Sequence, residues 1–158
     1  LQKLIIKIDI FFKGRNKLNN IMERLTTKRF NSNFAPNRTE FDWISDDEES
    51  VDNYIEDDLC GFKVTNGLWL DMVEGIESTF KDENYISNNK NLRILLVAGS
   101  KDPVGDNGKG VERLYTFLKN HFKYLSSFIF DNGRHEIFSD LNKDRCYKLL
   151  TDFFHEEI

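Results

Sequence analysis

The chain has 158 residues, of which 39% are hydrophobic and 31% are charged, a balance typical of a globular domain rather than a disordered or membrane-spanning chain. Its net charge is −5 and no basic run stands out, which argues against nucleic-acid binding, because that binding depends on clustered Lys and Arg. No uninterrupted apolar run is long enough for a transmembrane segment.

The first predicted element is an amphipathic helix. Apolar residues recur at helical spacing from Leu1 to Phe12, lysines occupy other positions, and Gly14 can end the helix. One interpretation buries the apolar face against other helices. The other is a lid helix that faces lipid substrate and touches a membrane surface, as basic amphipathic helices do. Because the chain begins at Leu1 inside this periodic segment, we expect the natural protein to extend further upstream.

The rest of the first half is predicted to be irregularly connected helices. A second helix is expected over residues 16–30, and the segment 31–39, which contains Pro36, interrupts the pattern. The acidic run 46–49 precedes apolar residues at helical spacing, and acidic residues complement the positive end of a helix dipole. A solvated helix explains this run better than a metal site does. Apolar residues every four positions predict a further helix over residues 68–80.

The second half has a different pattern. Residues 92–98 (LRILLVA) form a nearly continuous apolar run, as expected for a strand covered on both faces of a parallel sheet. A helix follows from Asn107, residues 124–130 (YLSSFIF) are the next strand candidate, and a last helix begins near Asn142. Strand, helix, strand, helix predicts a parallel α/β layer. Since two strands rarely make a stable sheet, we expect further strands upstream of Leu1.

An acid follows the first strand and a histidine follows the second. Asp102 lies in the segment 99–105 (GSKDPVG) and His135 in the segment 131–136 (DNGRHE). Each has a simpler explanation alone: Asp-Pro is a common turn, and a lone loop histidine is usually structural. Together they lie where open α/β sheets gather functional groups, at the carboxyl ends of neighbouring strands. A hydrolytic histidine needs such a carboxylate to fix its tautomer.

Three segments resemble the α/β-hydrolase superfamily. Residues 92–105 (LRILLVAGSKDPVG) resemble its penultimate strand and acid loop, and residues 128–138 (FIFDNGRHEIF) resemble its last strand and histidine loop. Residues 31–62 resemble the cap of the monoacylglycerol lipase, lysophospholipase and serine aminopeptidase-like branch. The resemblance implies an α/β fold in which residues 1–88 are the helical cap or lid region. Residues 89–158 would be the C-terminal part of the catalytic domain.

The resemblance also implies roles for individual residues. Asp102 would be the triad acid and His135 the general base and acid, with Val104 lining the site beside the acid. Aromatic residues of the cap are candidates for contact with an acyl chain, although such residues more often pack the core of the cap itself. These candidates are Phe34, Phe41, Trp43 and Trp69.

The family's nucleophile is missing from this sequence. The family delivers its triad in the order nucleophile, acid, histidine, with the serine in a Gly-x-Ser-x-Gly elbow, and no such elbow occurs here. Ser100 belongs to the acid loop and is a poor substitute. The oxyanion hole also comes from earlier segments. We therefore expect the chain alone to be inactive and its partner to be the N-terminal part of the same hydrolase.

The leading functional hypothesis is a serine hydrolase that cleaves carboxylic esters of a lysophospholipase or monoacylglycerol lipase type, with a small lipid or ester substrate. It needs no metal and no organic cofactor. One alternative is a non-catalytic interaction module derived from a hydrolase, and another is an amidase or peptidase of the same superfamily. Abundant Asn and scarce Ala suggest an AT-rich bacterial genome. We expect a cytoplasmic location and reduced, buried thiols at Cys60 and Cys146.

Other polar residues are weaker candidates. Arg134 can steer an anionic headgroup or form a surface salt bridge, and Glu136 can bond to the backbone of its own loop. His121 and His155 lack metal-ligand neighbours and are expected at exposed helix positions. The glycines at 105, 108 and 110 lack the order of a dinucleotide-binding motif.

Overall fold

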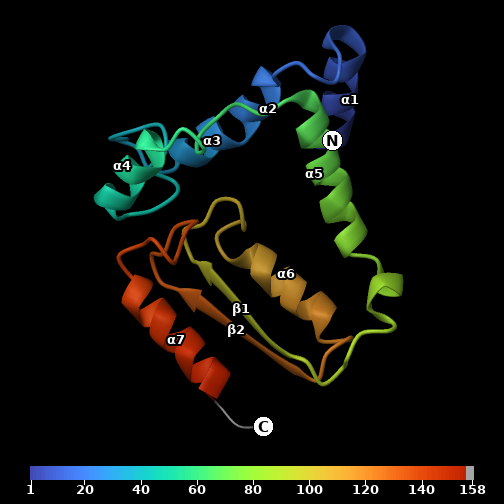
Figure 1. The fold of residues 1–158 in the computed structure, drawn as a ribbon, viewed down its shortest axis with the longest axis vertical. Helices are drawn as coiled ribbons and strands as arrows, with labels where there is room; N and C mark the ends of the chain where they lie inside the picture. Colours follow the sequence, from blue (N-terminus) through green and yellow to red (C-terminus); the bar gives the residue numbers. More distant parts are fainter. Residues whose placement is uncertain (156–158) are drawn as a thin grey trace.

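The computed structural model describes residues 1–155, and Figure 1 shows the helical first half of the chain set above a small sheet with a helix on either side. The first half contains α1 (Gln2–Lys13), α2 (Asn20–Leu25), α3 (Thr27–Ser32), α4 (Glu48–Glu56), α5 (Asn66–Thr79) and the 3-10 helix η1 (Asp82–Tyr85). The second half contains β1 (Arg93–Gly99), α6 (Lys109–Leu118), β2 (Tyr124–Phe130) and α7 (Lys143–His155). This order confirms the predicted α/β fold class.

The two strands are parallel, as predicted. β1 and β2 pair in register from Arg93 opposite Tyr124 to Gly99 opposite Phe130. Parallel strands cannot be joined by a tight hairpin, and α6 supplies the crossover between them. Because both strands run in the same direction, their carboxyl ends meet at one edge of the sheet. The loops that follow Gly99 and Phe130 therefore begin side by side.

Helices cover the two faces of this sheet unequally. Phe130 packs with Ile137 and Cys146 in a core cluster beneath α7. Ile129 points to the opposite face, where its side chain meets the start of α6 at Gly108. Residues 93–97 of β1 are partly buried and only its end at residues 98–99 is fully buried. Within residues 1–155 the only strand beside β1 is β2, which leaves its other edge open.

The helical first half has its own small core. α1 runs beside α5 (Figure 1), and the core between them contains Ile6, Met22, Trp69 and Leu70. Buried polar side chains also bond to each other in this region: the Asn66 side chain donates to the Asp9 carboxylate at 3.0 Å. The predicted first helix is confirmed, including its end at Gly14.

The single helix expected over residues 16–30 is wrong. Leu18 instead forms an antiparallel bridge with Thr65, and the Asn19 N–H donates to the Val64 carbonyl, so this stretch is extended. Asn19 then caps α2 by accepting the Met22 N–H at 2.8 Å. At Thr26 the backbone leaves the helical region, with φ −115° and ψ −96°, which separates α2 from α3. A pairing between distant segments overrode the local pattern.

The apolar stripes of two helices lie largely on the surface. In α1 the inward positions are Ile6 and Ile10, so only part of its apolar face is buried against other helices. The exposed apolar residues of α1 are Leu4, Ile8, Phe11 and Phe12, and those of the predicted helix 68–80 are Leu68, Met72, Ile76 and Phe80. None of the helices described in residues 1–155 combines the length and the apolar character that a bilayer crossing requires.

Candidate active site

Two loops at the carboxyl edge of the sheet form the site: the acid loop (residues 100–108) and the histidine loop (residues 131–142). They approach each other as closely as backbones allow. A Cβ atom on Gly99 would lie 2.0 Å from the Gly133 carbonyl oxygen, so only glycine fits at this crossing. The Lys101 N–H donates to the same carbonyl at 2.9 Å, and the Ser100 N–H donates to the Phe130 carbonyl at 2.9 Å. These bonds fix the acid loop against the histidine loop.

The two predicted site residues meet across this crossing. Nδ1 of His135 lies 3.0 Å from Oδ1 of Asp102, within hydrogen-bond distance. Asp102 is 8% exposed, and its Oδ1 also accepts the Val104 N–H at 2.9 Å. With Nδ1 engaged by the carboxylate, Nε2 is the ring nitrogen available to accept a proton from a reacting group.

Asp102 is held in its charged form by its neighbours. Burial by itself raises the pKa of Asp102, but the hydrogen bond and charge of His135 and the N–H groups of Val104 and Gly105 outweigh it. The pKa of Asp102 therefore lies below its ordinary value. An ionised carboxylate that accepts from Nδ1 is the arrangement that orients a general-base histidine.

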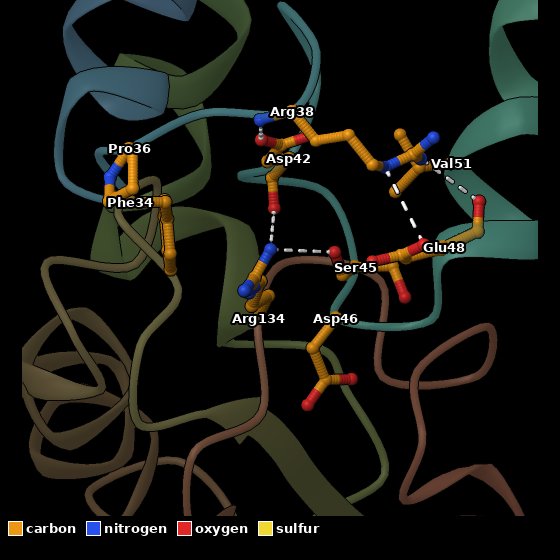
Figure 2. A pocket seen from close by; sticks show the side chains of 9 residues that line it. All are labelled: Phe34, Pro36, Arg38, Asp42, Ser45, Asp46, Glu48, Val51 and Arg134. Atoms are coloured by element: carbon orange, nitrogen blue, oxygen red, sulfur yellow. Dashed lines mark hydrogen bonds and ion pairs between the residues drawn. The ribbon is translucent and has the colours of Figure 1, made fainter.

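The helical region (residues 1–88) also contributes to this site. We refer to residues 42–47 as the docking segment, because they bond to the histidine loop along its length. Arg134 donates to the carbonyls of Asp42 and Ser45, the second at 2.9 Å, and Figure 2 shows its side chain reaching between them. The Glu136 N–H donates to the Ile44 carbonyl at 2.8 Å. Further bonds join Ser45 to Ser139, Asp46 to Leu141 and Asp47 to Lys143.

The docking segment places an indole against the imidazole. The rings of Trp43 and His135 have centroids 5.2 Å apart and planes inclined by 33°. Trp43 is buried, and its ring also contacts Phe30 at 5.6 Å between centroids. His135 thus has a carboxylate at one ring nitrogen and an aromatic ring against it.

Comparison with known proteins agrees with this architecture. Residues 6–142 match the family model described as serine aminopeptidase, S33. The chain belongs to the serine aminopeptidase S33 family. The resemblance to this branch of the α/β-hydrolases is confirmed. No curated protein sequence matches the chain closely enough to count.

Solved structures of α/β-hydrolases share the fold. A thermostable carboxyl esterase from Bacillus coagulans superposes with a TM-score of 0.81 at 21% identity, covering 96% of this chain and 50% of the esterase. A lipase in its open form gives a TM-score of 0.75 at 19% identity, covering 95% and 49%. The Paleococcus ferrophilus monoacylglycerol lipase gives 0.59 at 18% identity, covering 98% and 65%. The chain spans about half the length of the first two structures.

The aromatic residues proposed as substrate contacts in this S33 family member do not all lie together. Phe41, Trp43 and Trp69 line one cavity of about 270 Å³, together with Tyr54, Phe62 and Val64. Phe34 is elsewhere: its ring lies under the Arg134 guanidinium, 4.4 Å from the guanidinium carbon, in a smaller polar pocket (Figure 2). Val104 is half exposed and touches Asp102 through its N–H group.

Arg134 does not behave as either sequence-based hypothesis expected. Its side chain donates to backbone carbonyls and covers an aromatic ring, so it forms neither a surface salt bridge nor an open anion site. The pocket beside it is lined by the carboxylates of Asp42, Asp46 and Glu48 as well as by Arg38, so it is not a purely basic pocket. Arg134 is therefore a tether between the docking segment and the histidine loop. Glu136 joins that segment through its main chain.

Asp140 is a buried carboxyl that the sequence analysis missed. Its side chain is fully buried, Oδ2 accepts the Arg134 N–H at 2.8 Å, and Oδ1 has no hydrogen-bond partner among residues 1–155. Burial and the adjacent Asp46 carboxylate raise the pKa of Asp140 to about 6. A sequence signal was present, because an acid five residues after the histidine precedes the last helix.

The remaining candidates have structural surroundings. Ser100 Oγ accepts the Asn132 N–H at 2.9 Å and so joins the two loops. His121 is not the exposed helix residue expected: it lies beyond α6, stacks on Tyr85 at 4.8 Å and faces Asp82. His155 is exposed in α7, as expected. Cys60 and Cys146 are both free thiols, but only Cys146 is buried.

Proposed function

We propose that this chain carries the acid and histidine of an esterase active site, and that the N-terminal part of the same hydrolase supplies the nucleophilic serine and the oxyanion hole. The observation that supports this proposal is the 3.0 Å contact between Asp102 and His135 at the carboxyl edge of a parallel sheet. Family membership supports it independently.

The mechanism follows from this geometry. His135 Nε2 accepts the proton of the serine hydroxyl as the serine oxygen attacks the ester carbonyl. The carbon–oxygen bond to the alcohol then breaks, and the imidazolium gives its proton to the departing alcohol. Water attacks the acyl-enzyme with the same histidine as base, which releases the acid and restores the serine. Asp102 stabilises the imidazolium at both stages.

We propose a lipid-like ester, of the monoacylglycerol or lysophospholipid type, as the substrate. Aromatic side chains, among them Phe41, Trp43 and Trp69, line much of one cavity, whose wall also carries charged side chains such as Glu40 and Lys63, and Trp43 connects it to the imidazole. Apolar cavities with a few polar groups are typical small-molecule sites. The named activities of similar structures, a carboxyl esterase and a monoacylglycerol lipase, agree with esters as the class.

A fluorophosphonate probe tests the proposal, because it labels only serines that an active site has activated. The gene product that includes the sequence upstream of Leu1 is treated with the probe, and the labelled serine is identified by mass spectrometry. We expect one labelled serine in a Gly-x-Ser-x-Gly elbow. His135→Ala should abolish labelling, while His155→Ala, the matched exposed control, should retain it.

The same experiment addresses the chain alone. We expect residues 1–158 to remain unlabelled and to leave p-nitrophenyl esters intact, because Ser100 is bonded into the loop crossing. If the longer product also lacks an activated serine, the esterase proposal is wrong and the non-catalytic interaction module is favoured. The description serine aminopeptidase keeps amide cleavage as a second candidate function. Comparing aminoacyl amides with acyl esters at equal concentration distinguishes the two.

A further inference from the structure

The orientation of the His135 ring depends on the contacts that its side chain makes. The Asp102 contact orients the ring through Nδ1, and this single hydrogen bond still allows small rotations about the side-chain bonds of His135. His135 lies in the histidine loop, between β2 and α7, where no helix or strand restrains it. A second contact, on the face of the ring, would limit these rotations and hold Nε2 in one direction.

Trp43 supplies that second contact. The centroids of the indole and imidazole rings are 5.2 Å apart and the two planes are inclined by 33°, which is closer to a face-to-face than to an edge-to-face arrangement. Trp43 is itself restrained: it is 8% exposed, its main-chain N–H donates to the Asn31 side-chain oxygen at 3.1 Å, and the Phe30 ring packs against its indole. A buried aromatic ring with these contacts is a rigid surface against which a histidine can rest.

Hydrogen bonds from the residues on either side of His135 hold this ring contact in place. The residues before and after His135 are Arg134 and Glu136, and both bond to the docking segment. Arg134 donates to the carbonyls of Asp42 and Ser45 (Figure 2), and the Glu136 N–H donates to the Ile44 carbonyl. The carbonyls of Asp42 and Ile44 lie on either side of Trp43 in the chain. Arg134 and Glu136, which donate to them, lie on either side of His135. The two rings are thus held opposite each other by their neighbours.

We propose that Trp43 is a positioning residue for the triad histidine, held in place by the docking segment, so that this part of the helical region is a fixed component of the active centre. The proposal rests on the catalytic role assigned to His135. It assigns Trp43 two functions, one against the imidazole and one in the wall of the cavity. An experiment must therefore separate positioning from substrate binding.

The first test is spectroscopic and needs no activity. Selective ¹⁵N-histidine labelling of the 158-residue chain gives three imidazoles, those of His121, His135 and His155. We expect the His135 ring to carry its proton on Nδ1, with nuclear Overhauser contacts between its ring protons and the Trp43 indole. Trp43→Leu should broaden the His135 ring signals, because the ring then moves between orientations about its bond to Asp102, and should leave the other two signals unchanged. Unfolding would instead shift all three.

The matched control is Trp69→Leu, because Trp69 lines the same cavity and belongs to the other core. This variant should leave the His135 signals unchanged. Trp43→Phe keeps a planar aromatic ring and should restore narrow His135 ring signals. If Trp43→Leu does not fold, the Overhauser contacts of the unmodified chain still decide: their absence contradicts the proposal.

The second test is kinetic, on the gene product that contains the nucleophile. With p-nitrophenyl acetate, whose acyl group is too small to fill the cavity, Trp43→Leu should lower kcat about 10- to 100-fold, as misplaced catalytic groups do. Phe12→Leu, an exposed change on α1 outside the cavity, should change kcat for acetate less than twofold, whereas Trp69→Leu should raise KM for longer acyl esters. Unchanged kcat and unchanged His135 signals in Trp43→Leu would overturn the positioning role and leave the esterase proposal intact. A gene product without activity would overturn the esterase proposal while the spectra still test the contact.

Discussion

The helical region (residues 1–88) has two surfaces that contrast sharply. Its docking segment meets the histidine loop through hydrogen bonds to backbone groups and through the ring contact of Trp43. Its outer helices α1 and α5 pack on each other through a small core and leave their apolar stripes exposed. Hydrogen bonds and shape fix the first surface in one arrangement, whereas the second offers apolar area without directional partners. The helical region is therefore held by directional hydrogen bonds at the site, whereas its outer face exposes apolar side chains.

The largest expected effect is at the fixed surface. Asp102→Asn in the longer gene product removes the charge that holds Nδ1 protonated, so we expect kcat/KM for p-nitrophenyl esters to fall by about 10³–10⁴-fold, as in other acid–histidine–serine sites. Asp106→Asn is the matched control, because Asp106 lies in the same loop and pairs with Arg113 on the surface. A loss below tenfold in Asp102→Asn would show that the carboxylate is not the triad acid.

The second prediction compares one residue type on the two surfaces. Phe130 is 1% exposed in the core below the histidine loop, and Phe12 is 77% exposed on α1. Phe130→Ala should lower the free energy of unfolding by about 3–5 kcal/mol, since it leaves a cavity. Phe12→Ala should change it by less than about 0.5 kcal/mol. Urea titration of both variants measures this, and a similar loss in Phe12→Ala would show that the α1 stripe is covered in solution.

The third prediction concerns the buried Asp140 beside Asp46. The folded pKa of about 6 lies above the ordinary value of 3.8, so the folded state keeps a proton that the unfolded chain releases. The free energy of unfolding should therefore fall as pH rises from about 4 to 6, by roughly 1–3 kcal/mol. Asp140→Asn keeps a carbonyl for the Arg134 N–H and should remove this fall in urea titrations at pH 4.5 and 7.

A control separates this pair from Asp102. The lowered pKa of Asp102 contributes stability that is lost only as pH falls through values below 3.8, so its window does not overlap. Asp131→Asn, an exposed change in the histidine loop, should keep the fall of the unmodified chain. If Asp140→Asn shows the same fall in the free energy of unfolding between pH 4.5 and 7, the proton responsible is not bound to Asp140.

The smallest expected effect is on the outer face. Gly75 lies within α5 with no atom within 4 Å of a built Cβ, so alanine fits there and favours the helix. Gly75→Ala should raise the thermal midpoint slightly, with a gain of about 0.5–1 kcal/mol. Gly99→Ala, which drives a Cβ into the loop crossing, should instead prevent a stable site from forming. A Gly75→Ala variant that is destabilised would indicate that this face of α5 is packed.

The sequence was a good guide wherever neighbours in the chain decide the outcome. The helix ended by Gly14, the acidic start of α4 and the strand–helix–strand–helix order follow from local periodicity. Where a distant segment intervenes, local signals failed. Residues 16–19 are extended because Leu18 pairs with Thr65, and Arg134 is tethered to carbonyls far away in the chain.

The sequence by itself determined that Asp102 and His135 follow consecutive parallel strands, and the geometry of such strands places both at one edge. Only the tertiary structure decided that Trp43 rests against the imidazole, that Phe34 lies apart from Phe41, Trp43 and Trp69, and that the stripes of α1 and α5 stay exposed. The physical reason is that strand order and direction are encoded in local patterns. Contacts between loops depend instead on which backbone groups remain to be satisfied after the helices and strands have formed.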